Sequence, residues 1–173
     1  MPQPSPFAAR FSCRSFASTA LAEADMEYLI EAARWAPSAG NLQPWRFVVV
    51  TAAATKARLA TAAFGQAFVA QAPLVIVVCA LPEESARRYG DRGRSLYCLQ
   101  DTAAATQNIL LAASERGLGS CWVGAFDEHA VARAIAAPPG WRPVAMVPVG
   151  LALETPARRS RRPARETVVL QGT

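Results

Sequence analysis

The chain has 173 residues, of which 52% are hydrophobic and 18% are charged, and its formal net charge is +5. This length and composition predict one globular domain with a sizeable core and exclude a chain that is disordered throughout. No apolar run is long enough to span a bilayer, and no leader pattern opens the sequence. We therefore expect a cytoplasmic protein with no membrane partner.

The first third of the chain predicts an arm, a helix and a strand. Residues 1–9 are rich in proline and small side chains, which is typical of a flexible N-terminal arm. Apolar side chains recur at helical spacing over 25–35, so a helix is expected there, and Pro37 ends it. The β-branched run over 46–51 predicts a strand.

The middle of the chain alternates apolar and polar segments. An Ala-rich helix is expected over 55–68, with a break near Gly65. The apolar run over 74–81 lies between prolines and predicts a strand that is buried on both faces. Residues 82–94 are the most polar of this region, and they predict a short helix followed by a mobile loop.

The last third predicts the longest helix, 101–116, which is apolar on almost every face, as in a helix packed centrally or against a second copy. Three shorter elements are expected after it: a strand over 120–123, a helix over 127–136 capped by Asp127, and a strand over 144–149. Helices and hydrophobic strands alternate, which predicts an α/β protein whose sheet is covered by helices on both faces.

The cysteines and the single histidine show no metal-binding pattern. Cys13, Cys79, Cys98 and Cys121 include no Cys-x-x-Cys pair, and we expect them to be reduced thiols in the core. His129 is expected at the surface, so no metal site is predicted.

The N-terminal motif offers two arginines and a hydroxyl. In an extended segment, Arg10, Ser12 and Arg14 share one side, and guanidinium groups beside a hydroxyl suit a phosphate. The alternative is an ordinary surface segment that contains two arginines.

A second motif, Pro-Ser-Ala-Gly-Asn-Leu-Gln-Pro-Trp, runs from Pro37 to Trp45. Its prolines interrupt helical structure, and Pro44 disfavours the α conformation for Gln43. A rigid loop of hydroxyl, amide and backbone groups could present neutral hydrogen bonds to a flat ligand, or it could simply connect a helix to a strand.

Two further segments carry glycines and arginines. In 117–127, glycines would let a backbone N–H approach a ligand, or they would simply end a helix. The tail crowds five arginines, which suit a second phosphate contact, a partner subunit or a solvated tail: Arg158, Arg159, Arg161, Arg162 and Arg165. Interleaved aromatic residues are missing, so nucleic-acid binding is not expected.

Standard nucleotide and nucleophile motifs are absent from the sequence. There is no G-x-G-x-x-G after a strand and no P-loop. There is also no G-x-S-x-G, and one histidine leaves no credible catalytic triad.

Taken together, the separated motifs resemble the FMN-dependent nitroreductase superfamily. The resemblance covers about residues 10–169 and rests on the Arg-x-Ser-x-Arg start, the proline-bracketed loop, the Gly-Leu-Gly-x-x-Trp-x-Gly segment and the Arg-x-Arg tail. It implies an α+β fold, an α-β-α sandwich around a central mixed sheet, in an intertwined homodimer. Residues 10–155 would form the FMN-binding domain, and the Arg-rich tail 156–173 would complete the phosphate site and the dimer.

The resemblance also implies a role for each motif. Arg10 and Arg14 would hold the FMN phosphate with Arg159 and Arg161 of the tail, and Ser12 would face the ribityl or pyrimidine end. The backbone of Val123 and Gly124 would pass near the reactive flavin nitrogen. The residues that would frame the isoalloxazine ring from the other subunit are Pro37, Ser38, Ala39 and Asn41.

The activity implied is an oxidoreductase that takes hydride from NADH or NADPH and reduces nitroaromatic, quinone or enone-like acceptors by a ping-pong mechanism. No side chain would be an obligatory catalyst. The alternatives are a flavin carrier with little turnover, flavin destruction or reductive dehalogenation. The chain departs from the superfamily in its short region 50–100 and in Phe11, where a basic residue is frequent. The polar loop 87–94 is expected to cover the flavin.

Overall fold

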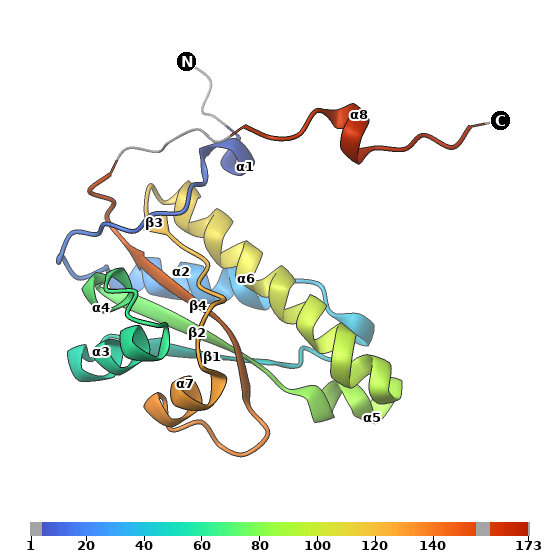
Figure 1. Cartoon of the computed structure of the whole chain (residues 1–173), viewed down its shortest axis with the longest axis horizontal. Coiled ribbons are helices and arrows are strands. Elements are labelled where there is room, and N and C mark those ends of the chain that lie inside the picture. The colour runs from blue at the N-terminus through green and yellow to red at the C-terminus, as the bar shows by residue number, and fades with distance from the viewer. Residues whose placement is uncertain (1–4, 155–159, 173) are drawn as a thin grey trace.

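The computed structural model describes residues 5–154 and 160–172. Its middle layer is a four-stranded sheet in the order β1-β2-β4-β3 (Figure 1). The strands are β1 (Trp45–Val50), β2 (Leu74–Ala80), β3 (Gly119–Ser120) and β4 (Arg142–Gly150). These strands all pair antiparallel, in place of the mixed sheet expected, and an isolated parallel bridge joins Ser12 to Ser120 of β3.

Strand β2 lies at the centre of the fold and is buried along its whole length, which confirms the prediction from its continuous apolar run. Its side chains alternate between two cores. Leu74, Ile76 and Val78 belong to one cluster. Val75, Val77 and Cys79 belong to the other. Because strand side chains point alternately to opposite faces, this one strand contributes to the clusters on both faces of the sheet.

Helices cover both faces of the sheet (Figure 1). On one face, α2 (Glu23–Arg34) and α6 (Cys98–Glu115) pack on the first cluster. On the other face, α3 (Ala53–Ala62), α4 (Phe68–Gln71) and α7 (Glu128–Ala134) pack on the second. The predicted α-β-α sandwich is confirmed.

Local signals in the sequence account for two of the helix boundaries. The Ala-rich segment is interrupted between α3 and α4, where Phe64 and Gly65 have φ values of 57° and 79°, so the predicted break is confirmed. The Asp127 carboxylate accepts a hydrogen bond from the Ala130 N–H at 2.9 Å, which confirms the predicted cap of α7.

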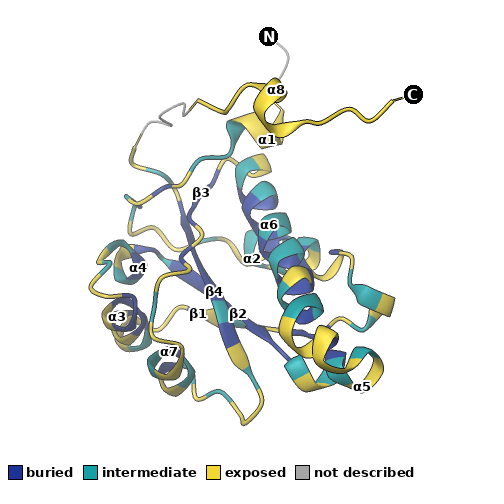
Figure 2. Cartoon of the chain, turned by 45° about the vertical axis from the view of Figure 1, so that its right-hand side comes forward, coloured by how far each residue is buried: buried dark blue, intermediate teal, exposed yellow. Residues whose placement is uncertain are grey.

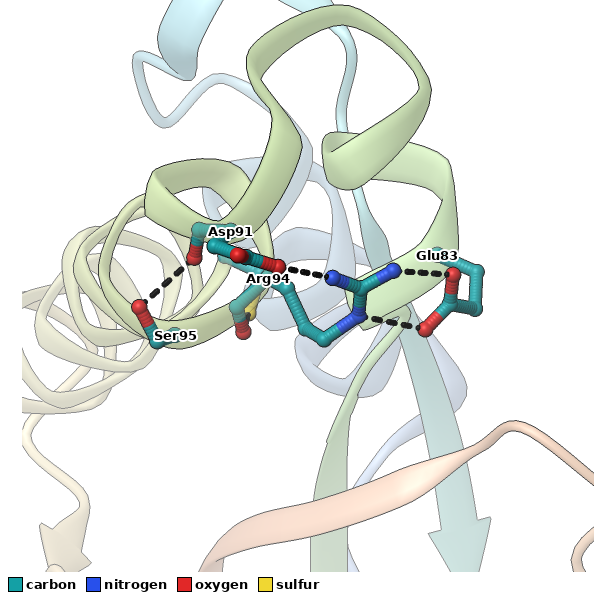
Figure 3. A network of polar contacts seen from close by, with 5 residues as sticks. Glu83, Asp91, Arg94 and Ser95 are labelled. Atoms are coloured by element: carbon teal, nitrogen blue, oxygen red, sulfur yellow. Dashed lines mark hydrogen bonds and ion pairs between the residues drawn. The ribbon is translucent and has the colours of Figure 1, made fainter.

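The prediction of a mobile loop within 82–94 is wrong. This segment is helical: α5 (Pro82–Arg92) bends at Gly90 and passes through a π-helical turn, η2 (Gly93–Tyr97), into α6. The Arg94 guanidinium holds the bend in place (Figure 3), with bonds of 2.8 and 2.9 Å to Glu83 and 2.5 Å to Asp91. Arg94 and Glu83 are 11 positions apart, so helical periodicity alone does not predict their pairing.

Exposure separates the sandwich from the ends of the chain (Figure 2). The short helices α1 (Pro6–Ala9) and α8 (Ala164–Thr167) contain no buried residue. All four cysteines are buried as free thiols and His129 is exposed, as predicted. Within residues 5–154 and 160–172, no helix is long and apolar enough to cross a membrane, and no cluster of three possible metal ligands occurs.

Candidate functional site

The N-terminal motif lies against β3. Besides the bridge from Ser12 to Ser120, the Cys13 N–H donates to the Ser120 carbonyl at 2.9 Å. Cys13 is fully buried whereas Ser12 and Arg14 are exposed, as the predicted alternation requires over these three residues. Gly119 allows this close packing, because a Cβ atom there would lie 2.7 Å from the Cys13 sulfur.

The two arginines of the motif lie on either side of this bridge. Arg10 is half-buried and lines a cavity of about 210 Å³ with Ser114 and Ser120. The Arg14 guanidinium lies over the Phe68 ring, 5.9 Å from its centroid. The Arg14 backbone N–H donates to the Glu154 carboxylate, and this hydrogen bond lowers the pKa of Glu154.

The chain continues from β3 to an exposed glycine. The Val123 N–H donates to the Met146 carbonyl at 2.8 Å, and the Val123 carbonyl accepts from the Met146 N–H at 3.0 Å. The amide of Val123 is therefore used inside the protein. Gly124 is exposed, and its N–H has no hydrogen-bond partner in the described part of the chain. Of the two predicted residues, Gly124 is the one whose N–H can reach a ligand.

The proline-bracketed loop is held in an unusual backbone conformation. It forms a 3-10 turn, η1 (Ala39–Asn41), and Gly40, Asn41 and Gln43 have φ values between 51° and 57°. Gln43 thus lies outside the right-handed α region, as Pro44 predicts. The Ser38 hydroxyl accepts the Gln43 N–H at 3.0 Å, so the hydroxyl of this loop is used to close it.

Asp101, which the sequence analysis did not single out, anchors this loop to α6. Its Oδ1 atom accepts the Ala39 N–H at 3.0 Å, while its Oδ2 atom is buried without a partner among the described residues. Burial raises the pKa of Asp101, and the bond from Ala39 opposes that shift. The sequence feature that could have identified Asp101 is that it is a carboxylate near the start of the most apolar helix.

The predicted site residues fall into two groups within one chain. Asp101, near the start of α6, holds the loop, whereas Ser114, near its end, lines the Arg10 cavity. These positions are 13 residues apart, which corresponds to about 20 Å along a helix. The two groups of predicted site residues therefore lie at opposite ends of α6. Figure 1 shows α5 and β3 near these opposite ends.

The arginines of the tail complete the predicted set. Arg159 lies outside the described residues. Arg161 is exposed, and its Nη1 donates to the Ser160 carbonyl at 3.2 Å. Figure 1 shows α8 and the C-terminal end extending away from the sheet.

Known proteins share this fold. A Streptococcus pneumoniae protein titled a nitroreductase family protein matches with a TM-score of 0.87 and 26% identity, over 96% of this chain and 98% of that chain. The NADPH:FMN oxidoreductase of Vibrio harveyi, solved in complex with NAD+, matches with a TM-score of 0.87 and 25% identity, over 97% of this chain and 76% of that chain. The helix-covered sheet is therefore an established α+β architecture.

Sequence comparison gives the family. The pattern of the Nitroreductase family matches residues 7–69 and 63–151. A protein of Archaeoglobus fulgidus, whose name joins NADH dehydrogenase to NAD(P)H nitroreductase, is 40% identical over 121 residues. That match covers 69% of this chain, and the chain spans 66% of that relative's length. The chain belongs to the Nitroreductase family.

Proposed function

We propose that this protein is an FMN-dependent oxidoreductase that takes hydride from NADH or NADPH and reduces small electron-poor acceptors. The acceptor class is nitroaromatic, quinone or enone-like, and the order of steps is ping-pong. The names of the Archaeoglobus and Vibrio proteins support the donor, and the Vibrio name supports FMN. The functional unit is a homodimer with FMN at the interface.

The observation that carries this proposal is the bridge between Ser12 and Ser120. It places the guanidinium-bearing segment beside the strand that leads to Gly124. Positive charge is therefore available at one end of the site and an open backbone N–H further along it. A ligand with a phosphate at one end and a polar-edged ring at the other suits this donor set, and FMN has that chemistry.

The separation of the two groups of predicted site residues supports the homodimer. In one chain, α6 keeps the loop 37–45 about 20 Å from the Arg10 cavity. The two therefore contact the same FMN only if the loop comes from a second copy across an interface. The accessible part of α6 offers a surface for that contact, since Ala103, Ala104 and Leu111 are only partly buried. In the dimer, Pro37, Ser38, Ala39 and Asn41 of one copy frame the ring held by the other.

The residues of the site bind and orient rather than react. FMN, when bound, supplies the hydride and electron transfer. Arg10 and Arg14, with Arg159 and Arg161 of the tail, would hold its phosphate end, and Ser12 would face the ribityl or pyrimidine end. The Gly124 N–H would donate to the ring edge. Asp101 fixes the backbone of the framing loop from behind, through Ala39. No side chain is assigned as an obligatory acid.

A visible absorption spectrum of the purified protein tests the cofactor. We expect yellow protein, with released FMN at about one per chain, because each chain contributes one half of each of two sites. Colourless protein that cannot be loaded with FMN would show that the site residues serve only as scaffold.

Steady-state oxidation of NADH and NADPH tests the activity. We expect turnover with a nitroaromatic or a quinone. For ping-pong transfer, double-reciprocal plots of initial rate against donor concentration should be parallel at different acceptor concentrations. A protein that retains FMN and turns over with neither acceptor would instead be a flavin carrier.

A further inference from the structure

The bent helix α5 lies directly on the backbone of the framing loop. A Cβ atom added at Gly40 would lie 2.5 Å from the Tyr89 hydroxyl and 2.9 Å from the Arg88 Nη1 atom. The side chains at the end of α5 therefore cover the loop that frames the proposed flavin ring. Any ligand that approaches the ring across this loop meets them.

The arginines of this region differ in their charge partners. Glu83 and Asp91 are both bonded to Arg94, and Glu84 pairs with Arg46 at 3.3 Å. Arg88 and Arg92 have no acidic partner within the described residues, and both are exposed. The acidic side chains of α5 are thus already paired, whereas Arg88, beside the loop, and Arg92, on the Tyr97 ring, have no acidic partner among the described residues.

Aromatic rings hold these two guanidinium groups in place. The Arg88 guanidinium carbon lies 5.5 Å from the Tyr89 ring centroid, and that of Arg92 lies 5.3 Å from the Tyr97 ring centroid. The two rings pack edge to face, with centroids 5.2 Å apart. The arginines are therefore supported on one aromatic pair, and Arg92 also donates from Nε to the Tyr97 hydroxyl at 2.9 Å.

We infer that Arg88 and Arg92 bind the diphosphate of the dinucleotide electron donor. This inference rests on the proposed use of NAD(P)H. Planar guanidinium groups bind phosphate oxygens in bidentate fashion, so two of them offer donors to both phosphates of a diphosphate. Nitroaromatic, quinone and enone acceptors carry no phosphate, so this pair selects the donor and not the acceptor.

The test compares Arg88→Ala, Arg92→Ala and the double variant with Arg87→Ala. Arg87 is the matched control, because it is exposed on the same helix with the same charge but lies toward Glu83. Two donors are used: NADPH, and a dihydronicotinamide that carries only a benzyl group. The second donor has the same reacting ring and no phosphate.

For each single variant we expect the KM for NADPH to rise about tenfold or more, with kcat nearly unchanged. The KM for the benzyl donor should stay at its wild-type value, and Arg87→Ala should change neither. Equal rises for both donors would overturn the inference, as would an equal effect of Arg87→Ala. Loss of bound FMN from Arg88→Ala would assign these arginines to the flavin and overturn it as well.

A binding measurement keeps this test independent of turnover. ADP-ribose carries the diphosphate without the nicotinamide, and its affinity can be measured by calorimetry on the purified protein. The double variant should bind it about a hundredfold more weakly than wild type, and Arg87→Ala should bind it normally. If ADP-ribose binds all of these proteins equally, or none of them, the inference fails even where FMN binding and activity are confirmed.

Discussion

Arg14 provides the most direct residue-scale test of the proposed phosphate site. Its guanidinium lies over Phe68, and its backbone N–H is already engaged by Glu154, so removal of the side chain leaves the local fold in place. Arg14→Ala should weaken FMN binding by about 1.5 to 3 kcal/mol, the scale of a charged hydrogen bond. Fluorescence titration of the apoprotein measures this. Arg34→Ala, which removes an exposed ion pair with Glu31, serves as the control. Unchanged affinity in Arg14→Ala would exclude the assigned role.

Asp101 predicts a pH dependence of stability. Burial raises its pKa above the ordinary value of 3.8, so the folded protein binds this proton more tightly than the unfolded chain does. Ionisation of Asp101 therefore costs folding free energy, and that cost disappears as the pH falls from the folded pKa toward 3.8. Asp101→Asn keeps an oxygen for the Ala39 N–H but does not titrate.

The comparison is between wild type and Asp101→Asn in urea, at about pH 7 and about pH 4. The free energy of unfolding of wild type should increase relative to that of the variant as the pH falls. A difference that stays constant over this range would mean that the carboxyl titrates alike in both states.

At the scale of elements, the bend of α5 depends on Gly90. Its φ of 56° and ψ of −142° suit glycine, and an added Cβ atom would contact nothing within 4 Å. Gly90→Ala should therefore destabilise the protein by about 1–3 kcal/mol through backbone strain alone. Chemical denaturation measures this, with Gly172→Ala as a control at an open position. Equal stability of the two variants would contradict the argument.

The elements also show what local sequence signals determine. Helical periodicity located α2, and apolar segments located α6 and β2. The Asp127 cap and the break at Gly65 were predictable because each depends on neighbouring residues. A short helix was predicted at the start of 82–94, but its continuation through 97 was missed, because the contact between Arg94 and Glu83 appears only once the chain has bent. Asp101 was missed for the same reason, since its partner Ala39 is 62 positions away.

At the scale of the whole molecule, the tail predicts the oligomeric state. Val168, Val169 and Leu170 are 54%, 86% and 90% exposed, an apolar run that a single chain leaves in water. In the proposed homodimer this run packs on the partner. Deletion of 164–173 should therefore shift the protein to monomers and reduce its bound FMN, while the sandwich stays folded because its core clusters contain no tail residue.

Sedimentation together with flavin absorbance measures both effects. Val169→Asp with Leu170→Asp keeps the length of the tail and should reproduce the loss of dimer. A truncated protein that remains dimeric and yellow would show that α6 alone makes the interface.

The burial of the four cysteines protects them from oxidation in the folded protein. Burial raises the pKa of Cys13 to about 11 and that of Cys79 to about 12, and it raises the pKa of Cys98 and Cys121 as well. The thiolate is the form that peroxide and alkylating agents attack, and at neutral pH almost none is present. Oxidation or alkylation of these cysteines therefore requires the sandwich to unfold locally or globally. The rate of cysteine modification consequently measures how often the protein opens.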